Sequence, residues 1–115
     1  MAIQTLSLRN TMATAYGTNC LYGALTTTAP GSVTGTEVSG GSPAYARKAT
    51  AWGAASASAI TSTALTFDVP ASTTVVGYEH FSAVTAGTYL DGVSITSQTF
   101  ASQGTYAITP TYTQS

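Results

Sequence analysis

The chain has 115 residues, of which 43% are hydrophobic and only 6% are charged, and its formal net charge is −1. This length suits one domain with a modest core, and the hydrophobic content excludes a chain that stays disordered. Three basic residues are too few for a cationic patch, and no apolar run approaches a membrane span, so we expect neither a nucleic-acid nor a membrane partner.

The first segment, residues 1–19, is predicted to be an N-terminal arm or short helix. Leu8, Met12 and Tyr16 recur every fourth residue and would form one apolar stripe on a helix. Gly17 then falls where a glycine often ends a helix. An extended arm lying on a neighbouring subunit is the alternative. No signal peptide is evident in the first ten residues, which lack a basic and an apolar region.

From residue 20 onward, short apolar stretches alternate with turn residues. Cys20 is the single cysteine, so no disulfide can form within the chain, and we expect a buried, inert thiol and folding in a cytoplasm. A long loop is expected at 29–43, residues 54–59 could be a loop or a weak strand, and Pro110 marks an edge strand. Strands are expected at 20–26, 45–52, 65–69, 74–81, 89–95 (bulged at Asp91–Gly92) and around Tyr106, Ile108 and Tyr112.

This spacing predicts an all-β fold, a single antiparallel β-sandwich of jelly-roll or immunoglobulin-like type with a short N-terminal helix or arm. The domain boundaries would be 1–19 for the arm and 20–115 for the sandwich. Period-two alternation selects the expected core: Leu25, Trp52, Leu65, Phe67, Val69, Val76, Tyr78, Leu90, Ile95 and Ile108.

The acidic and basic residues do not form a catalytic pattern. Glu37, Asp68, Glu79 and Asp91 are scattered along the chain, and His80 is the single histidine. On a strand, Glu79 and His80 point to opposite faces. Neither a zinc site nor a nucleophile elbow is evident, so we expect no catalytic residue, no metal and no cofactor.

The low charge instead favours a subunit that packs against other subunits, as a homo-oligomer or in repeated copies. A neutral secreted domain is the alternative. Trp52 and the seven tyrosines are expected in the core or at interfaces, although they could also form a stacking platform for a carbohydrate.

Glu37 and Arg47 form the one candidate ion pair. The long loop could fold back and bring them together, pinning the Gly40–Gly41 turn against the strand at Tyr45. Two unrelated surface charges, or an Arg47 that pairs with an acid of a neighbouring subunit, are the other readings.

The run LYGALTTTAPGSVTGTEVSGGSPAYARKATAWGAAS, residues 21–56, resembles a family of small virion proteins of tailed phages. Its Leu-Tyr-x-Ala-Leu strand, Pro-Gly turn, Glu-Val-Ser-Gly-Gly stretch and Ala-Arg pair carry the resemblance. The later Phe-Asp-Val-Pro and Ala-Gly-Thr-Tyr-Leu segments extend it.

The resemblance implies a non-enzymatic structural protein of the virion, assembled in the cytoplasm of a host bacterium. The first expectation is a decoration or minor capsid protein that binds and stabilises the major capsid lattice. A minor tail or tail-fibre component, bound to other tail proteins, is the second, and a carbohydrate-binding module is the third. The expected interface residues are Glu37, Tyr45, Arg47, Trp52 and Tyr112.

Overall fold

A computed structural model describes residues 2–115. One helix precedes eight strands. Their bounds are α1 Leu6–Asn19, β1 Tyr22–Thr26, β2 Lys48–Ala49, β3 Ala59–Thr61, β4 Leu65–Val69, β5 Thr73–Phe81, β6 Tyr89–Phe100, β7 Gly104–Ile108 and β8 Thr111–Thr113.

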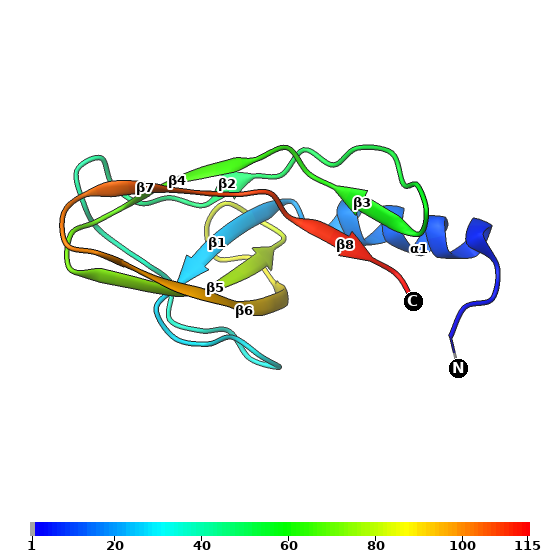
Figure 1. Cartoon of the computed structure of the whole chain (residues 1–115), viewed down its shortest axis with the longest axis horizontal. Coiled ribbons are helices and arrows are strands. Elements are labelled where there is room, and N and C mark those ends of the chain that lie inside the picture. The colour runs from blue at the N-terminus through cyan, green and yellow to red at the C-terminus, as the bar shows by residue number, and fades with distance from the viewer. Residues whose placement is uncertain (1) are drawn as a thin grey trace.

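Two antiparallel layers enclose the core. One is a four-stranded sheet in the order β2-β1-β5-β6, and the other is the β4–β7 pair, which continues into the β3–β8 pair toward the helix (Figure 1). Leu25 of β1 and Tyr78 of β5 meet Leu65, Phe67 and Val69 of β4 between the layers. The predicted all-β sandwich with a short helix is therefore confirmed.

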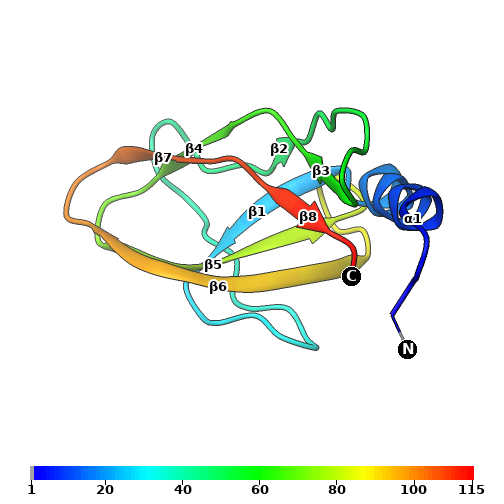
Figure 2. The ribbon, with the colours of Figure 1, turned by 45° about the vertical axis from the view of Figure 1, so that its right-hand side comes forward.

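Helix α1 lies beyond one end of the sandwich and packs against β3 and β8 (Figure 2). Thr5 caps its first turn, because the Thr5 hydroxyl accepts a hydrogen bond from the Leu8 amide at 3.3 Å. The helix runs past Gly17 to Asn19, so the predicted end at Gly17 is wrong. The predicted boundary between residues 19 and 20 coincides with the end of the helix, but it remains a prediction as a domain division, and Met1 lies outside the described residues.

The buried face of α1 is not the predicted stripe. Leu8 and Met12 are 48% and 43% exposed and Tyr16, the third residue of the stripe, is half-buried, whereas Ala13 is fully buried and Gly17 is buried. A Cβ at position 17 would lie only 2.9 Å from Cδ1 of Ile60. The small residue Gly17 thus lets the helix approach β3 closely, while the Tyr16 ring contacts Tyr112 of β8.

Several strand bounds differ from the expectations. The stretch 45–52 contains only the two-residue β2. Most of its other residues form a loop, which contacts β1 through the Tyr45 side chain. Residues 59–61 form β3 by pairing with β8, a partner about 50 residues away. Strand β6 extends five residues past Ile95. Of the two irregularities in its pairing with β5, the one near the predicted bulge lies at Leu90 rather than at Asp91–Gly92.

The core predictions hold where alternation is regular. Leu25, Leu65, Phe67, Val69 and Tyr78 are buried, while Ile95 and Ile108 pack against them half-buried. Two positions are wrong. The β5–β6 register shifts between Val75 and Gly77, so Val75 is buried and Val76 only partly so. Leu90, at the second irregularity, is 41% exposed. Trp52 is half-buried against the helix.

The molecule is elongated, with extents of 47 × 25 × 24 Å. Helix α1 and the β3–β8 pair extend the sandwich along its long axis, as Figure 1 shows. The radius of gyration, 14.8 Å, exceeds the ~13 Å expected for a compact domain of this length.

Candidate functional site

Three of the five predicted interface residues meet in one cluster, which we call the Arg47 clamp: Glu37, Tyr45, Arg47 and Phe81. Arg47 donates from Nε to Glu37 Oε2 at 3.0 Å and from Nη2 to Glu37 Oε1 at 2.9 Å. This bidentate geometry is the strongest form of the arginine–carboxylate pair. The predicted intrachain pair is therefore present, and the two residues are not unrelated surface charges.

The clamp joins four parts of the chain. Nη1 of Arg47 donates to the carbonyls of Ala83 and Ala86, at 3.0 and 2.7 Å, which ties down the 82–88 loop. The guanidinium carbon also lies 3.7 Å from the centre of the Phe81 ring, an arrangement that favours a cation. The hydrogen bonds to Glu37 raise the pKa of Arg47 above its ordinary value.

Tyr45 connects the clamp to the sheet. Its hydroxyl donates to Glu37 Oε2 at 2.9 Å and accepts from the Leu25 amide of β1 at 3.0 Å. Burial raises the pKa of Tyr45, so the phenol stays protonated. The preceding turn needs its two glycines, because Gly40 and Gly41 have φ values of +88° and +100°.

The remaining two predicted residues, Trp52 and Tyr112, belong to a second cluster at the helix. The Tyr112 ring stacks on the Tyr16 ring with centroids 3.8 Å apart, and Trp52 meets the same ring edge-on at 6.0 Å. The Trp52 indole donates to the Cys20 carbonyl at 2.9 Å. Both rings are thus built into the fold, which is not how an exposed carbohydrate platform presents them.

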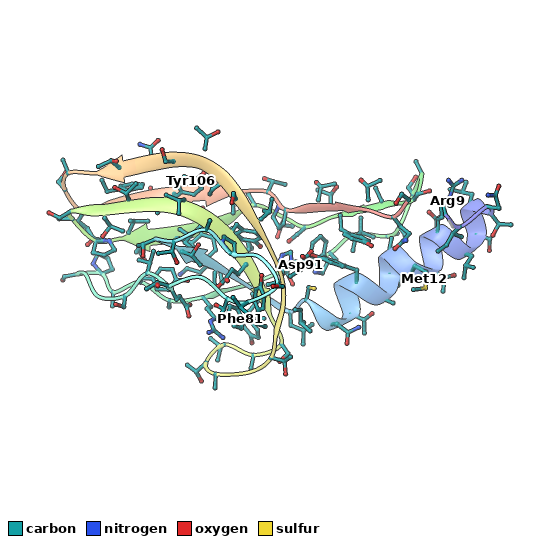
Figure 3. The ribbon with its side chains drawn as sticks, turned by 90° about the horizontal axis from the view of Figure 1, so that it is seen from below. Arg9, Met12, Phe81, Asp91 and Tyr106 are labelled. Carbon is teal, nitrogen blue, oxygen red and sulfur yellow. The ribbon has the colours of Figure 1, made fainter. Side chains whose placement is uncertain are left out.

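Around Tyr16 lies a chain of hydrogen bonds that the sequence did not indicate, here called the Tyr16–His80 network: Asp91, Tyr16, His80 and Tyr78. The Tyr16 hydroxyl donates to Asp91 Oδ2 at 2.7 Å and lies 2.9 Å from His80 Nδ1. The Tyr78 hydroxyl lies 2.9 Å from His80 Nε2. Asp91 marks the point where sandwich and helix meet in Figure 3.

The protons of this network follow from donor counting. Tyr16 has one proton, which goes to Asp91, so its oxygen accepts from Nδ1–H of His80. A neutral imidazole then accepts at Nε2, and Tyr78 is the donor there. Burial lowers the pKa of His80 to about 4, against a smaller opposing effect of Asp91. Burial and the bond to Asp91 raise the pKa of Tyr16.

A cleft of about 300 Å³ adjoins the network, between Asp91–Val93 of β6 and residues 108–112. Both ring nitrogens of His80, which lines this cleft, are hydrogen-bonded, so no lone pair is free to take a proton from a substrate.

The Glu79 side chain points to the opposite face of β5 from His80, as predicted for neighbours on a strand. Its buried carboxylate accepts hydrogen bonds from the Thr34 hydroxyl at 3.0 Å and the Gly35 amide at 2.7 Å.

The remaining candidates for chemistry among the described residues are the cysteine and the side chains that could bind a metal ion. Cys20 is buried as predicted, and burial raises the pKa of its thiol to about 11. Within residues 2–115, no three His, Cys, Asp or Glu side chains are placed to share a metal ion. The helix found there lacks the length and apolar content to cross a membrane.

The Arg47 clamp and the Tyr16–His80 network, together the two braces, thus hold parts of the fold to one another. Comparison of the sequence with known families identifies the family. A family model described as podophage GP4 fiber I protein gp80 matches residues 2–113. No curated protein and no solved structure matches the chain. The match covers nearly the whole chain, including the helix, so it is not confined to the sandwich.

Proposed function

Since the chain belongs to the podophage GP4 fiber I protein gp80 family, a family of phage virion proteins, we propose that it is a structural subunit of a phage fibre. The observation that carries the proposal is the family match over residues 2–113. Of the locations expected from the sequence, the fibre accords with this match better than decoration of the capsid lattice. The partners would be other components of the same virion.

The shape of the molecule supports this role. Helix and sandwich lie end to end along a 47 Å axis, and the two braces hold their junction and the long loops in place. A fibre subunit has to transmit force along its length without local unfolding. Side-chain networks whose members are all hydrogen-bonded rigidify a fold.

We also propose that the role is not enzymatic. The support is chemical: His80 has both nitrogens bonded and a low pKa, and Arg47 is engaged by Glu37 and two loop carbonyls. Groups satisfied in this way stabilise the fold but are not available to a substrate.

Localisation on the particle tests the fibre proposal. Virions would be labelled with an antibody against this chain and imaged, and the copy number would be measured by quantitative mass spectrometry against the major capsid protein. A fibre subunit gives label on fibres only and a copy number far below that of the capsid protein. Label over the whole head, with copies comparable to the capsid protein, would replace this proposal by lattice decoration.

A further inference from the structure

The cleft beside the Tyr16–His80 network contains an acid without a basic partner. Asp91 lines this cleft of about 300 Å³, and neither lysine nor arginine is among the described residues that line it. The ion pair between Arg47 and Glu37 belongs to the Arg47 clamp, which is a different part of the molecule. Figure 3 shows Asp91 where the sandwich meets the helix. One wall of the cleft therefore carries a negative charge that no neighbouring cation balances.

The network offers a ligand acceptors but no donors. The Tyr16 proton is donated to Asp91, and the Nδ1 proton of His80 is donated to Tyr16. The Tyr78 proton is donated to Nε2 of His80. A carboxylate can accept about four hydrogen bonds, whereas the described donors to Asp91 are two, the Tyr16 hydroxyl at 2.7 Å and the Gly92 amide at 2.9 Å. Asp91 thus has free lone pairs, while every proton of the network is already used.

This balance selects the polar end of a ligand. An anion would be repelled by Asp91, and a neutral hydroxyl would make no use of its charge. An ammonium group carries three donors, no acceptor and a positive charge, so it matches a wall that presents acceptors and a negative charge.

Apolar side chains line another part of the cleft and select the rest of the ligand. Val93, Ile108 and Pro110 all line it, and Val93 is 55% exposed. The aliphatic stem of an amine packs on such side chains while its charged end stays in a polar environment. A volume of about 300 Å³ is at the lower end of the range for small-molecule sites, so it suits one short stem.

We propose that this cleft binds a primary alkylammonium group, with Asp91 as the residue that pairs with the cation. The ammonium group would donate to the free lone pairs of Asp91, and its stem would lie against Val93 and Ile108. A lysine side chain and a free polyamine share this chemistry. The inference concerns the chain itself and does not depend on where it sits in the virion.

Titration of the isotope-labelled full chain, followed by NMR at pH 7, tests the proposal. The probes are Nα-acetyl-lysine amide and putrescine, one for each source of the group, and the control is the lysine amide acetylated at Nε, which carries no charge. At this pH a lysine-type amine is protonated, whereas His80, with its pKa of about 4, is neutral. We expect saturable shifts of the Gly92, Val93 and Thr111 amides with at least one amine and none with the control. The amine that binds more tightly identifies the source.

Two matched substitutions assign the binding to Asp91. Asp91→Asn removes the charge but retains an oxygen that can accept from the Tyr16 hydroxyl, and Asp68→Asn removes the same charge from an acid that does not line the cleft. We expect Asp91→Asn to weaken binding of the amine at least about tenfold and Asp68→Asn to leave it nearly unchanged.

A second pair of variants serves if Asp91→Asn does not fold, as judged by its melting curve. Val93→Lys places a competing ammonium group at the cleft and should weaken binding of the amine. Val84→Lys places the same group at a similarly exposed valine, 49% exposed, in the 82–88 loop, and should not.

The inference is overturned if neither amine gives a saturable shift, or if the acetylated control binds as well as the lysine amide. Equal weakening by the two members of a matched pair also overturns it, because the attraction would then come from the charge of the whole chain. Each of these results leaves the fibre proposal intact, since location and copy number on the virion test that proposal.

Discussion

Acidification should destabilise this protein through one residue, His80. The side chain is 5% exposed, and burial lowers its pKa to about 4 from the ordinary 6.5. The unfolded chain therefore binds a proton that the folded chain excludes. In such a case, stability is fully present above pH 6.5 and is lost as the pH falls from 6.5 toward 4.

The size of the effect follows from the two pKa values. A difference of about 2.5 units corresponds to about 3 kcal/mol of unfolding free energy. This is a large share of the ~5–15 kcal/mol that stabilises a typical domain. Protonation at Nε2 also removes the acceptor for the Tyr78 hydroxyl, so the network loses a bond at the same time.

Urea unfolding at several pH values between 7.5 and 4 measures this loss. The control is His80→Asn, which leaves the sequence without histidine and retains an amide donor near the Nδ1 position. The difference in unfolding free energy between the two proteins should shrink by about 3 kcal/mol on going from pH 7.5 to 4. Curves that stay parallel over this range would refute the reasoning, because His80 would then titrate alike in both states.

Four substitutions, two of them also combined in a double variant, probe the remaining contacts. Gly17→Ala should destabilise the fold by about 1–3 kcal/mol in thermal unfolding, because its Cβ would crowd Ile60 at 2.9 Å, although alanine alone favours a helix by ~1 kcal/mol. Glu37→Gln and Arg47→Met should each cost about 1–3 kcal/mol in urea unfolding, and the double variant less than their sum, because one pair is lost; additive losses would contradict a coupled pair. Glu79→Gln should remove an acceptor from the 27–37 loop, whose amides would then exchange hydrogen faster, whereas unchanged exchange would show that the carboxylate does not hold the loop.

The alternation of apolar and polar residues predicted the strands whose burial follows from that alternation alone. Leu65, Phe67 and Val69 lie on one face of a regular strand with one buried side, so the sequence pattern and the burial agree. At Val76 the pattern failed because a register irregularity, set by the partner strand, shifted the buried side to Val75. Strand β3 was missed for a related reason, since its pairing with β8 is a tertiary contact.

The helix shows a different limit. Hydrophobic periodicity selected Leu8, Met12 and Tyr16, of which Tyr16 packs against Tyr112, but the close contact with β3 lies at Gly17, where small size is what matters. A search for hydrophobic periodicity does not select a residue as small as glycine as a contact residue. Close approach of a helix can be recognised only when the neighbouring side chains, here Ile60, are known.

The two braces differed in how far the sequence indicated them. Glu37 and Arg47 are ten residues apart in a chain with few charges, so a pairing could be suggested. Tyr16 lies 64 and 75 residues from His80 and Asp91, and no local motif links them. Only the fold brings such partners together, and a lone histidine between a tyrosine of the helix and a tyrosine of its own strand has no signature in one sequence.

The composition and the structure are connected through the hydroxyl groups. Three of the four acids in the sequence each accept a hydrogen bond from a side-chain hydroxyl: Glu37 from Tyr45, Glu79 from Thr34 and Asp91 from Tyr16. For Glu79 and Asp91, hydroxyl and amide groups thus take the place that basic side chains hold in more highly charged proteins, whereas Glu37 also pairs with Arg47. Glu79 and Asp91 are therefore bound by neutral donors. A chain with so few charges offers little electrostatic resistance to association, which suits a phage protein that associates with other virion components.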